Sequence, residues 1–314
     1  MKAALMALFM APASAGAFEL ALPVACDLGK TCFIQHYPDH DPGPAAQDHA
    51  CGSLTYDGHD GTDFALNSLS AMQTGVAVLA AAPGVVRGAR DGRPDISVSD
   101  PGAPPLDGMD CGNGVAIQHE GGYETQYCHL KQGSLRVKPG DRVEAGTPLG
   151  EVGLSGNTEF PHLHLTLRQN GVAIDPAAPR LRGCGGGGPD LWQADLPPPV
   201  GGIIAAGFAP QVPEFAQIKQ GDVPAPVAKS DGMVLWAYLY GTRAGDRLVL
   251  DLQGPEGRII ADSLALERTQ AQSFRAIGQR LRAAQWPAGV YSGTAILTRN
   301  GAEIDRAEVS LSLP

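Results

Sequence analysis

Apolar and polar residues alternate in short stretches along this chain, and Gly- and Pro-rich turns separate the stretches, a pattern typical of β-strands. The clearest alternation covers residues 160–167, where three leucines alternate with polar residues. Because side chains alternate between the two faces of a strand, His162 and His164 are predicted to share one face while the leucines anchor the other.

A β-hairpin is predicted to turn at residues 120–122, with a strand on each side. If His119 pairs with Tyr123, His129 lies opposite Asn113 in the neighbouring strand. We therefore expect the hairpin to hold His129 on one face of a sheet.

Glycine and proline clusters at residues 183–189 and 196–199 are typical of a linker. The short strands before it predict an all-β fold with a small barrel-like antiparallel core. After it, alternating stretches and hairpin turns predict a β-sandwich of immunoglobulin-like type, with strands at 233–240, 247–252 and 289–297. The expected organisation is a secretory signal peptide at 1–17, a cysteine-tied segment at 18–50, the core domain at 51–180, the linker at 181–200 and the β-sandwich at 201–314.

Composition and charge limit the classes of partner. The chain has 314 residues, 43% of them hydrophobic and 18% charged, which is ordinary for a globular protein of two domains. Its formal net charge of −10 does not suit a protein that holds nucleic acid or other anionic polymers through a basic patch. We expect no nucleic-acid partner, and recognition confined to a local groove.

The first 17 residues combine one cation, Lys2, with an apolar stretch and small residues, as in a secretory signal peptide cleaved after Ala15 or Ala17. The alternative is a hydrophobic N-terminal strand. No other stretch reaches the roughly 18 apolar residues that span a bilayer. We therefore expect no membrane span and a soluble mature protein that is periplasmic or secreted.

All six cysteines follow the predicted signal peptide, and an even number in an exported chain suggests up to three disulfides. They lack the paired short spacing of zinc ligands. The predicted hairpin brings Cys111 near Cys128, and a short local loop favours Cys26–Cys32. Cys51–Cys184 then follows by elimination.

Two sets of histidines suggest metal chemistry. Two glycines in residues 56–64 allow a tight turn that would bring His59 and Asp63 onto one centre. Neutral imidazole and carboxylate are good zinc ligands, and three protein ligands with an open position form a catalytic site. We predict that His59, Asp63 and either His162 or His164 bind one Zn²⁺. Residues 36–49 also contain histidines and could form a second metal site, but their prolines favour a loop tied down by cysteines.

Several motifs occur in an order that resembles the lysostaphin-type or LytM-like zinc metallopeptidases, which cut peptides of bacterial cell walls. The resemblance covers roughly residues 50–178 and rests on His59-x-Gly61-Thr62-Asp63, Tyr127-x-His129-Leu130, Gly153-x-Ser155-Gly156-Asn157-Thr158 and Pro161-His162-Leu163-His164.

The resemblance implies that His59, Asp63 and His164 ligate Zn²⁺ and that His129 and His162 are the catalytic histidines, with the division of roles between these two left open. Two residues depart from the family pattern. Phe160 replaces a small glycine, and Thr166 replaces a common acidic residue. Neither change removes a ligand, so we expect an effect on the shape of the site.

The function implied is a periplasmic or secreted zinc endopeptidase that uses metal-activated water to hydrolyse peptidoglycan stem peptides or cross-bridges. The family often cuts D-alanyl to diaminopimelate crosslinks. One alternative is a non-catalytic regulator of a cell-wall amidase, although such relatives have usually lost zinc ligands. Another is a secreted protease acting on proteins. The sequence of the C-terminal domain contains no recognisable set of catalytic residues. We expect this domain to be either a binding or spacing module, which could contact a protein partner, or a structural appendage.

Overall fold

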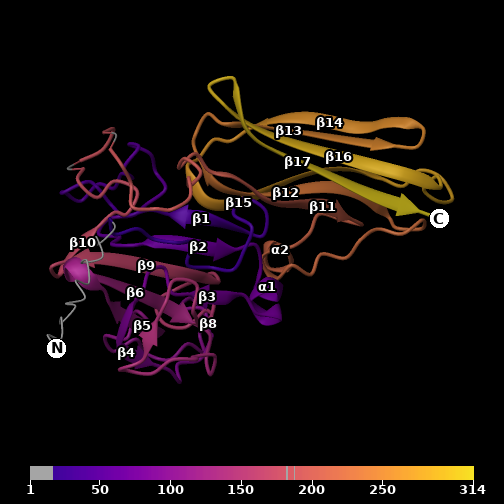
Figure 1. The fold of residues 1–314 in the computed structure, drawn as a ribbon. Helices are drawn as coiled ribbons and strands as arrows, with labels where there is room; N and C mark the ends of the chain where they lie inside the picture. Colours follow the sequence, from indigo (N-terminus) through magenta and orange to yellow (C-terminus); the bar gives the residue numbers. More distant parts are fainter. Residues whose placement is uncertain (1–16, 182, 187) are drawn as a thin grey trace, which may run out of the picture.

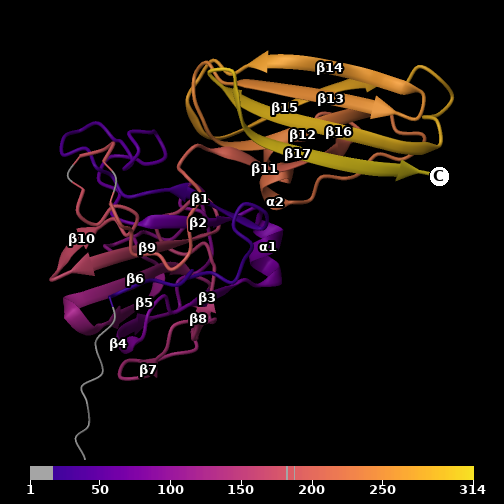
Figure 2. The same ribbon diagram turned by 45° about the horizontal axis from the view of Figure 1, so that its top comes forward.

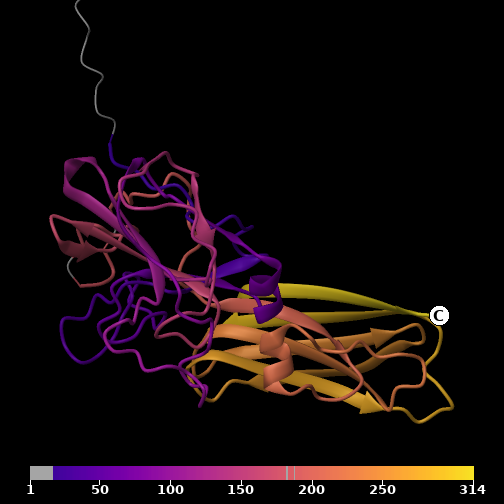
Figure 3. The same cartoon turned by 90° about the horizontal axis from the view of Figure 1, so that it is seen from below.

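The computed structural model describes residues 17–181, 183–186 and 188–314. The predicted signal peptide therefore lies outside the described residues, except for Ala17. Two β-rich regions lie side by side, one containing the strands between residues 32 and 174 and one those between residues 202 and 313 (Figure 1, Figure 3). The expected all-β class is confirmed.

The first region is built on an antiparallel sheet whose described strands follow the order β1-β2-β9-β6-β5-β4-β7, with β10 paired to β9. Because β1 and β7 lie at opposite edges, this sheet is open rather than a closed barrel within the described chain. Its strands are β1 (Cys32–His36), β2 (Thr62–Leu66), β4 (Gly84–Arg90), β5 (Asn113–Gln118), β6 (Tyr123–Leu130), β7 (Arg142–Val143), β9 (His162–Gln169) and β10 (Val172–Ile174). A small sheet of β3 (Ala77–Leu79) and β8 (Pro148–Glu151) and the helix α1 (Leu69–Thr74) complete the region.

The alternation predicted for residues 160–167 is confirmed in β9. Leu163, Leu165 and Leu167 are all 0% exposed and belong to the core of the first region. Phe64 of β2 lies in the same core and packs edge-on against Trp192, at 5.8 Å between ring centroids. The Gly- and Pro-rich segment after β10 is thus attached to the core through Trp192.

The β5–β6 hairpin turns at the short 3-10 helix η1 (Glu120–Gly122), as expected, but one predicted pairing is wrong. Asn113 pairs with Leu130 and not with His129, because the register shifts between Asn113 and Val115. The shift places an extra residue in β6, where His129 adopts a φ of 63° and its N–H donates to the Cys111 carbonyl at 2.8 Å. A bulge of this kind bends the strand and redirects a side chain.

The three expected disulfides are confirmed, and no free cysteine remains among the described residues. Within the same residues, no helix is long and apolar enough to cross a membrane.

The second region is a β-sandwich, with one described sheet ordered β11-β12-β15 and the other β14-β13-β16-β17 (Figure 2). The strands predicted at 233–240, 247–252 and 289–297 are found in β12, β13 and β16. The elements are β11 (Gly202–Ala209), α2 (Phe215–Gln220), β12 (Gly232–Thr242), β13 (Arg247–Gly254), β14 (Gly257–Ala265), β15 (Gln270–Arg280), β16 (Gly289–Arg299) and β17 (Ala302–Leu313).

Candidate metal and catalytic site

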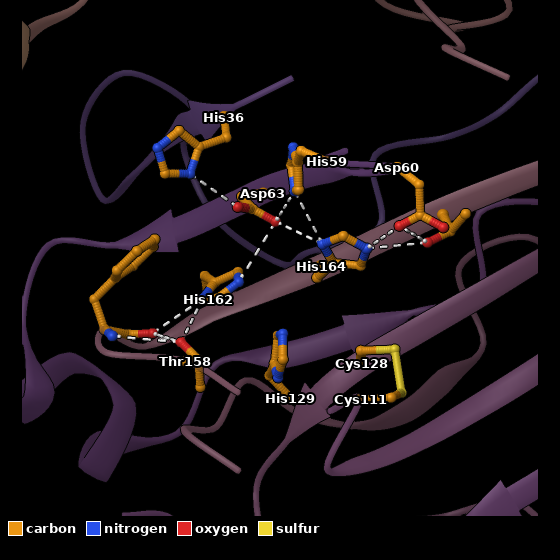
Figure 4. A network of polar contacts seen from close by, with 12 residues as sticks. His36, His59, Asp60, Asp63, Cys111, Cys128, His129, Thr158, His162 and His164 are labelled. Atoms are coloured by element: carbon orange, nitrogen blue, oxygen red, sulfur yellow. Dashed lines mark hydrogen bonds and ion pairs between the residues drawn. A yellow bond between two sulfur atoms is a disulfide. The ribbon is translucent and has the colours of Figure 1, made fainter. Parts of the chain in front are cut away.

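Three adjacent strands bring the candidate ligands together. Asp63 of β2 pairs with His164 of β9 on one side and with His36 of β1 on the other. His59 precedes β2 in a turn, and its ring lies 5.0 Å from the ring of His164 between centroids. Figure 4 shows the imidazoles gathered around the Asp63 carboxylate.

The donor atoms of three residues form a compact triangle. His59 Nε2 lies 3.2 Å from both Asp63 Oδ1 and His164 Nδ1, and the last two atoms are 2.9 Å apart. Nitrogen and oxygen ligands about 2.0–2.1 Å from a tetrahedral zinc are themselves about 3.3 Å apart. The triangle is only slightly tighter, so the donor set fits a metal of this size. Of the two histidines left open by residue type alone, His164 completes this triangle.

Hydrogen bonds outside the triangle leave its nitrogens free to bind metal. His59 Nδ1 lies 2.8 Å from the Tyr37 carbonyl oxygen, which can only accept, so Nδ1 carries the proton and Nε2 keeps its lone pair. His164 Nε2 lies 3.2 Å from Asp60 Oδ1 and 3.0 Å from Thr166 Oγ1, which leaves Nδ1 free in the same way. Such outer contacts fix the tautomer and orientation of metal ligands.

His129 and His162 lie beside this triangle, with ring centroids 4.6 Å apart. His129 Nδ1 lies 2.8 Å from the Ser155 carbonyl oxygen and His162 Nδ1 2.9 Å from that of Phe160, so each Nε2 is free to exchange a proton. His162 Nε2 is 3.4 Å from Asp63 Oδ1. His129, His162 and His164 also form a group of potential ligands, so the site offers two overlapping donor sets.

The electrostatics of the site favour a positive charge next to the Asp63 carboxylate. Burial lowers the pKa of His129 well below 6.5, and the nearby His162 and His164 lower it further. Burial also lowers the pKa of His164, but contacts with Asp60 and Asp63 outweigh it and raise the value to about 9. Burial raises the pKa of Asp63, but the surrounding imidazoles, first His59, lower it well below 3.8. The carboxylate is therefore ionised at neutral pH.

One residue of the site was not predicted. His36, assigned to the loop, is the last residue of β1, and its Nδ1 lies 3.1 Å from Asp63 Oδ2. The apolar residues just before it could have indicated a strand. The remainder of the predicted loop, residues 37–49, contains no strand. Its His40 and His49 contact the buried Asp175 Oδ2 at 2.9 and 3.2 Å.

Residues 57–176 match Peptidase family M23. This segment is an M23 peptidase domain. It contains all five residues predicted for the site, whereas His36 precedes it and the β-sandwich follows it.

Known proteins share parts of this chain. The DD-carboxypeptidase/endopeptidase Mpg of Neisseria meningitidis serogroup B is 38% identical over 84 residues, or 27% of this chain and 18% of that protein. The peptidoglycan DD-endopeptidase ShyC of Vibrio cholerae is 39% identical over 70 residues, or 22% of this chain and 16% of that protein. The solved catalytic domain of lysostaphin from Staphylococcus simulans has 24% identity and a TM-score of 0.30, covering 45% of this chain and 85% of that domain. The chain thus spans less than a fifth of the length of either curated relative.

Proposed function

We propose that this protein is a zinc-dependent endopeptidase that hydrolyses peptide crosslinks of bacterial peptidoglycan. The observation that carries the proposal is the triangle of His59 Nε2, Asp63 Oδ1 and His164 Nδ1 with two further imidazoles beside it. The M23 domain supports a peptidase, and the name of the Vibrio cholerae relative, a peptidoglycan DD-endopeptidase, supports peptidoglycan as the substrate.

His59, Asp63 and His164 would hold the zinc. When bound, zinc polarises a carbonyl group and acidifies water enough for attack near neutral pH. The low pKa of His129 keeps its Nε2 unprotonated, which suits a group that accepts the proton of the attacking water. His162 Nε2, 3.4 Å from the Asp63 carboxylate, is placed to carry a proton and to stabilise an oxyanion or protonate the leaving amine.

We propose a periplasmic or secreted location. Structural disulfides persist mainly in oxidising compartments, and the described cysteines are all paired. The predicted signal peptide agrees with export.

Digestion of purified sacculi, with mass spectrometry of the products, tests the proposal. The parent protein is expected to bind about one zinc per chain and to release peptides cut within their crosslinks. His129→Ala should keep zinc and fold but lose at least about a hundredfold in turnover, the usual scale for one acid-base group. His164→Ala should lose the metal itself.

Three results would contradict the proposal. A zinc-loaded parent that leaves sacculi intact but stimulates an amidase would be a regulator. A parent that cuts casein and not sacculi would be a protease acting on proteins. Parent-like turnover in His129→Ala would remove the proposed proton acceptor.

A further inference from the structure

The β-sandwich is fixed against the strand that carries His36. Gln35 of β1 is 0% exposed and donates from Nε2 to the Ala271 carbonyl at 3.1 Å, while its Oε1 accepts from Gln272 Nε2 at 2.9 Å. The two regions also share a hydrophobic cluster, which includes Phe33 of β1 and Trp236 of β12. The start of β15 is therefore held next to the candidate metal site.

A cavity of about 720 Å³ lies between the two regions and reaches the site. On the M23 side its lining includes Asp63, His129 and His162. On the opposite side the sandwich contributes Phe215 and Lys219 of α2 together with the first residues of β15. A substrate on the candidate metal would thus contact both regions.

The sandwich side of this cavity carries a positive charge. The Lys219 side chain is exposed, and its Nζ lies over the Phe215 ring at a cation–π distance of 5.2 Å from the ring centre. Within the described part of the chain, Lys219 forms no ion pair with a carboxylate. Glu159 lines the same cavity from the M23 side and supplies the opposite charge. Apart from the Asp63 carboxylate of the candidate metal site, the lining thus carries one acidic and one basic side chain, which fits a peptide with a free carboxylate and a free amine better than a polyanion.

We propose that the β-sandwich forms one wall of the substrate-binding groove and that Lys219 binds a free carboxylate of the peptide substrate. This inference rests on the proposed peptidase function and gives the C-terminal domain a part in substrate selection. Lys219 acts in binding and takes no part in the chemical step, so its loss should raise KM and leave kcat unchanged.

The test uses the full-length, zinc-loaded protein and crosslinked muropeptides from sacculi, with their carboxylates either free or converted to amides. The parent should show a KM about fivefold lower for the free form, the scale of a favourable solvent-exposed ion pair. Lys219→Gln should raise KM for the free form by that factor, keep kcat within about twofold and leave the amidated form unaffected. Added salt should weaken binding of the free form to the parent but not to the variant.

Lys229→Gln is the matched control, because Lys229 is an exposed lysine of the same region that does not line the cavity. It should keep the parent values. If the parent hydrolyses both forms and Lys219→Gln keeps its KM, the inference is wrong while the proposed function stands. If the parent hydrolyses neither form, the proposed function fails. Binding of the free form to the parent and to Lys219→Gln is then measured by calorimetry, and the Kd values are compared in place of KM. Equal Kd values for parent and Lys219→Gln would overturn the inference in that case also.

Discussion

Replacing His36 is expected to weaken zinc binding although His36 is not a candidate ligand. Its Nδ1 lies 3.1 Å from Asp63 Oδ2, while Asp63 Oδ1 lies in the ligand triangle. Asp63 is 2% exposed, so bulk water does not readily replace the lost partner. Loss of such an outer partner usually lowers metal affinity by about 10- to 100-fold. This corresponds to about 1.4–2.8 kcal/mol of binding free energy.

The replacement of His36 also affects the stability of the metal-free protein, and a second measurement separates this effect from the change in zinc affinity. His36 also contacts the Asp63 carboxylate when no metal is bound, so its loss destabilises the metal-free protein. Zinc affinity changes only to the extent that His36 orients Asp63 Oδ1 toward the metal. Zinc Kd is measured by competition with a chromophoric chelator, and the free energy of unfolding of the metal-free protein by urea denaturation. His36→Ala should show the full loss, whereas His36→Asn keeps a donor and should lose much less.

His49→Ala serves as the matched control, because His49 also contacts a buried carboxylate, Asp175, away from the ligand triangle. It should leave zinc affinity unchanged. A zinc Kd for His36→Ala within about twofold of the parent would refute the argument that His36 orients Asp63.

Two further predictions concern stability. Replacing Cys111 and Cys128 together by serine should lower the free energy of unfolding, measured by urea denaturation, by about 3 kcal/mol, the value expected for a disulfide that closes a loop of similar length. Unchanged stability would contradict a structural role of this disulfide. Burial lowers the pKa of His49, but the Asp175 carboxylate outweighs burial and raises this pKa above 6.5. The His49–Asp175 ion pair therefore stabilises the fold fully below pH 6.5, and this stabilisation is lost as the pH rises through the raised pKa. Asp175, whose own pKa is lowered, stays ionised at pH 6. The Tm difference between parent and Asp175→Asn should therefore be larger at pH 6 than at pH 9, and a difference independent of pH would contradict this reasoning.

The sequence predicted those parts of the site that depend on local pattern. The alternation along β9 places His162 and His164 on one face whatever the rest of the chain does, because side chains alternate along every strand. The turn that joins His59 and Asp63 is also local, because the two residues are only four positions apart. The partner of Asp63 in β1 could not be predicted in the same way, because the pairing of β1 with β2 joins segments about 30 residues apart through a long loop.

The wrong pairing predicted for His129 and the missed contact of His36 have the same physical origin. In β6 one extra residue shifts the pairing, so that His129 does not lie opposite Asn113. In β1 the register also shifts, between Ile34 and His36, so that His36 rather than Gln35 pairs with Asp63. An extra residue changes which face every following side chain occupies, and residue alternation alone does not reveal where it is inserted.

Each of these bulges is held by its own contact, and the two contacts connect the site to different parts of the molecule. The Cys111–Cys128 disulfide joins the chain just before β5 to the residue preceding His129. Gln35, the extra residue in β1, is held through both atoms of its amide by β15 of the sandwich. His129 is thus fixed by a covalent bond within the M23 domain, whereas His36 depends on the packing of the two regions. Movement of the sandwich would therefore loosen His36, and through it Asp63, before it affected His129. The same contact that completes the proposed substrate groove thus also supports a candidate metal ligand.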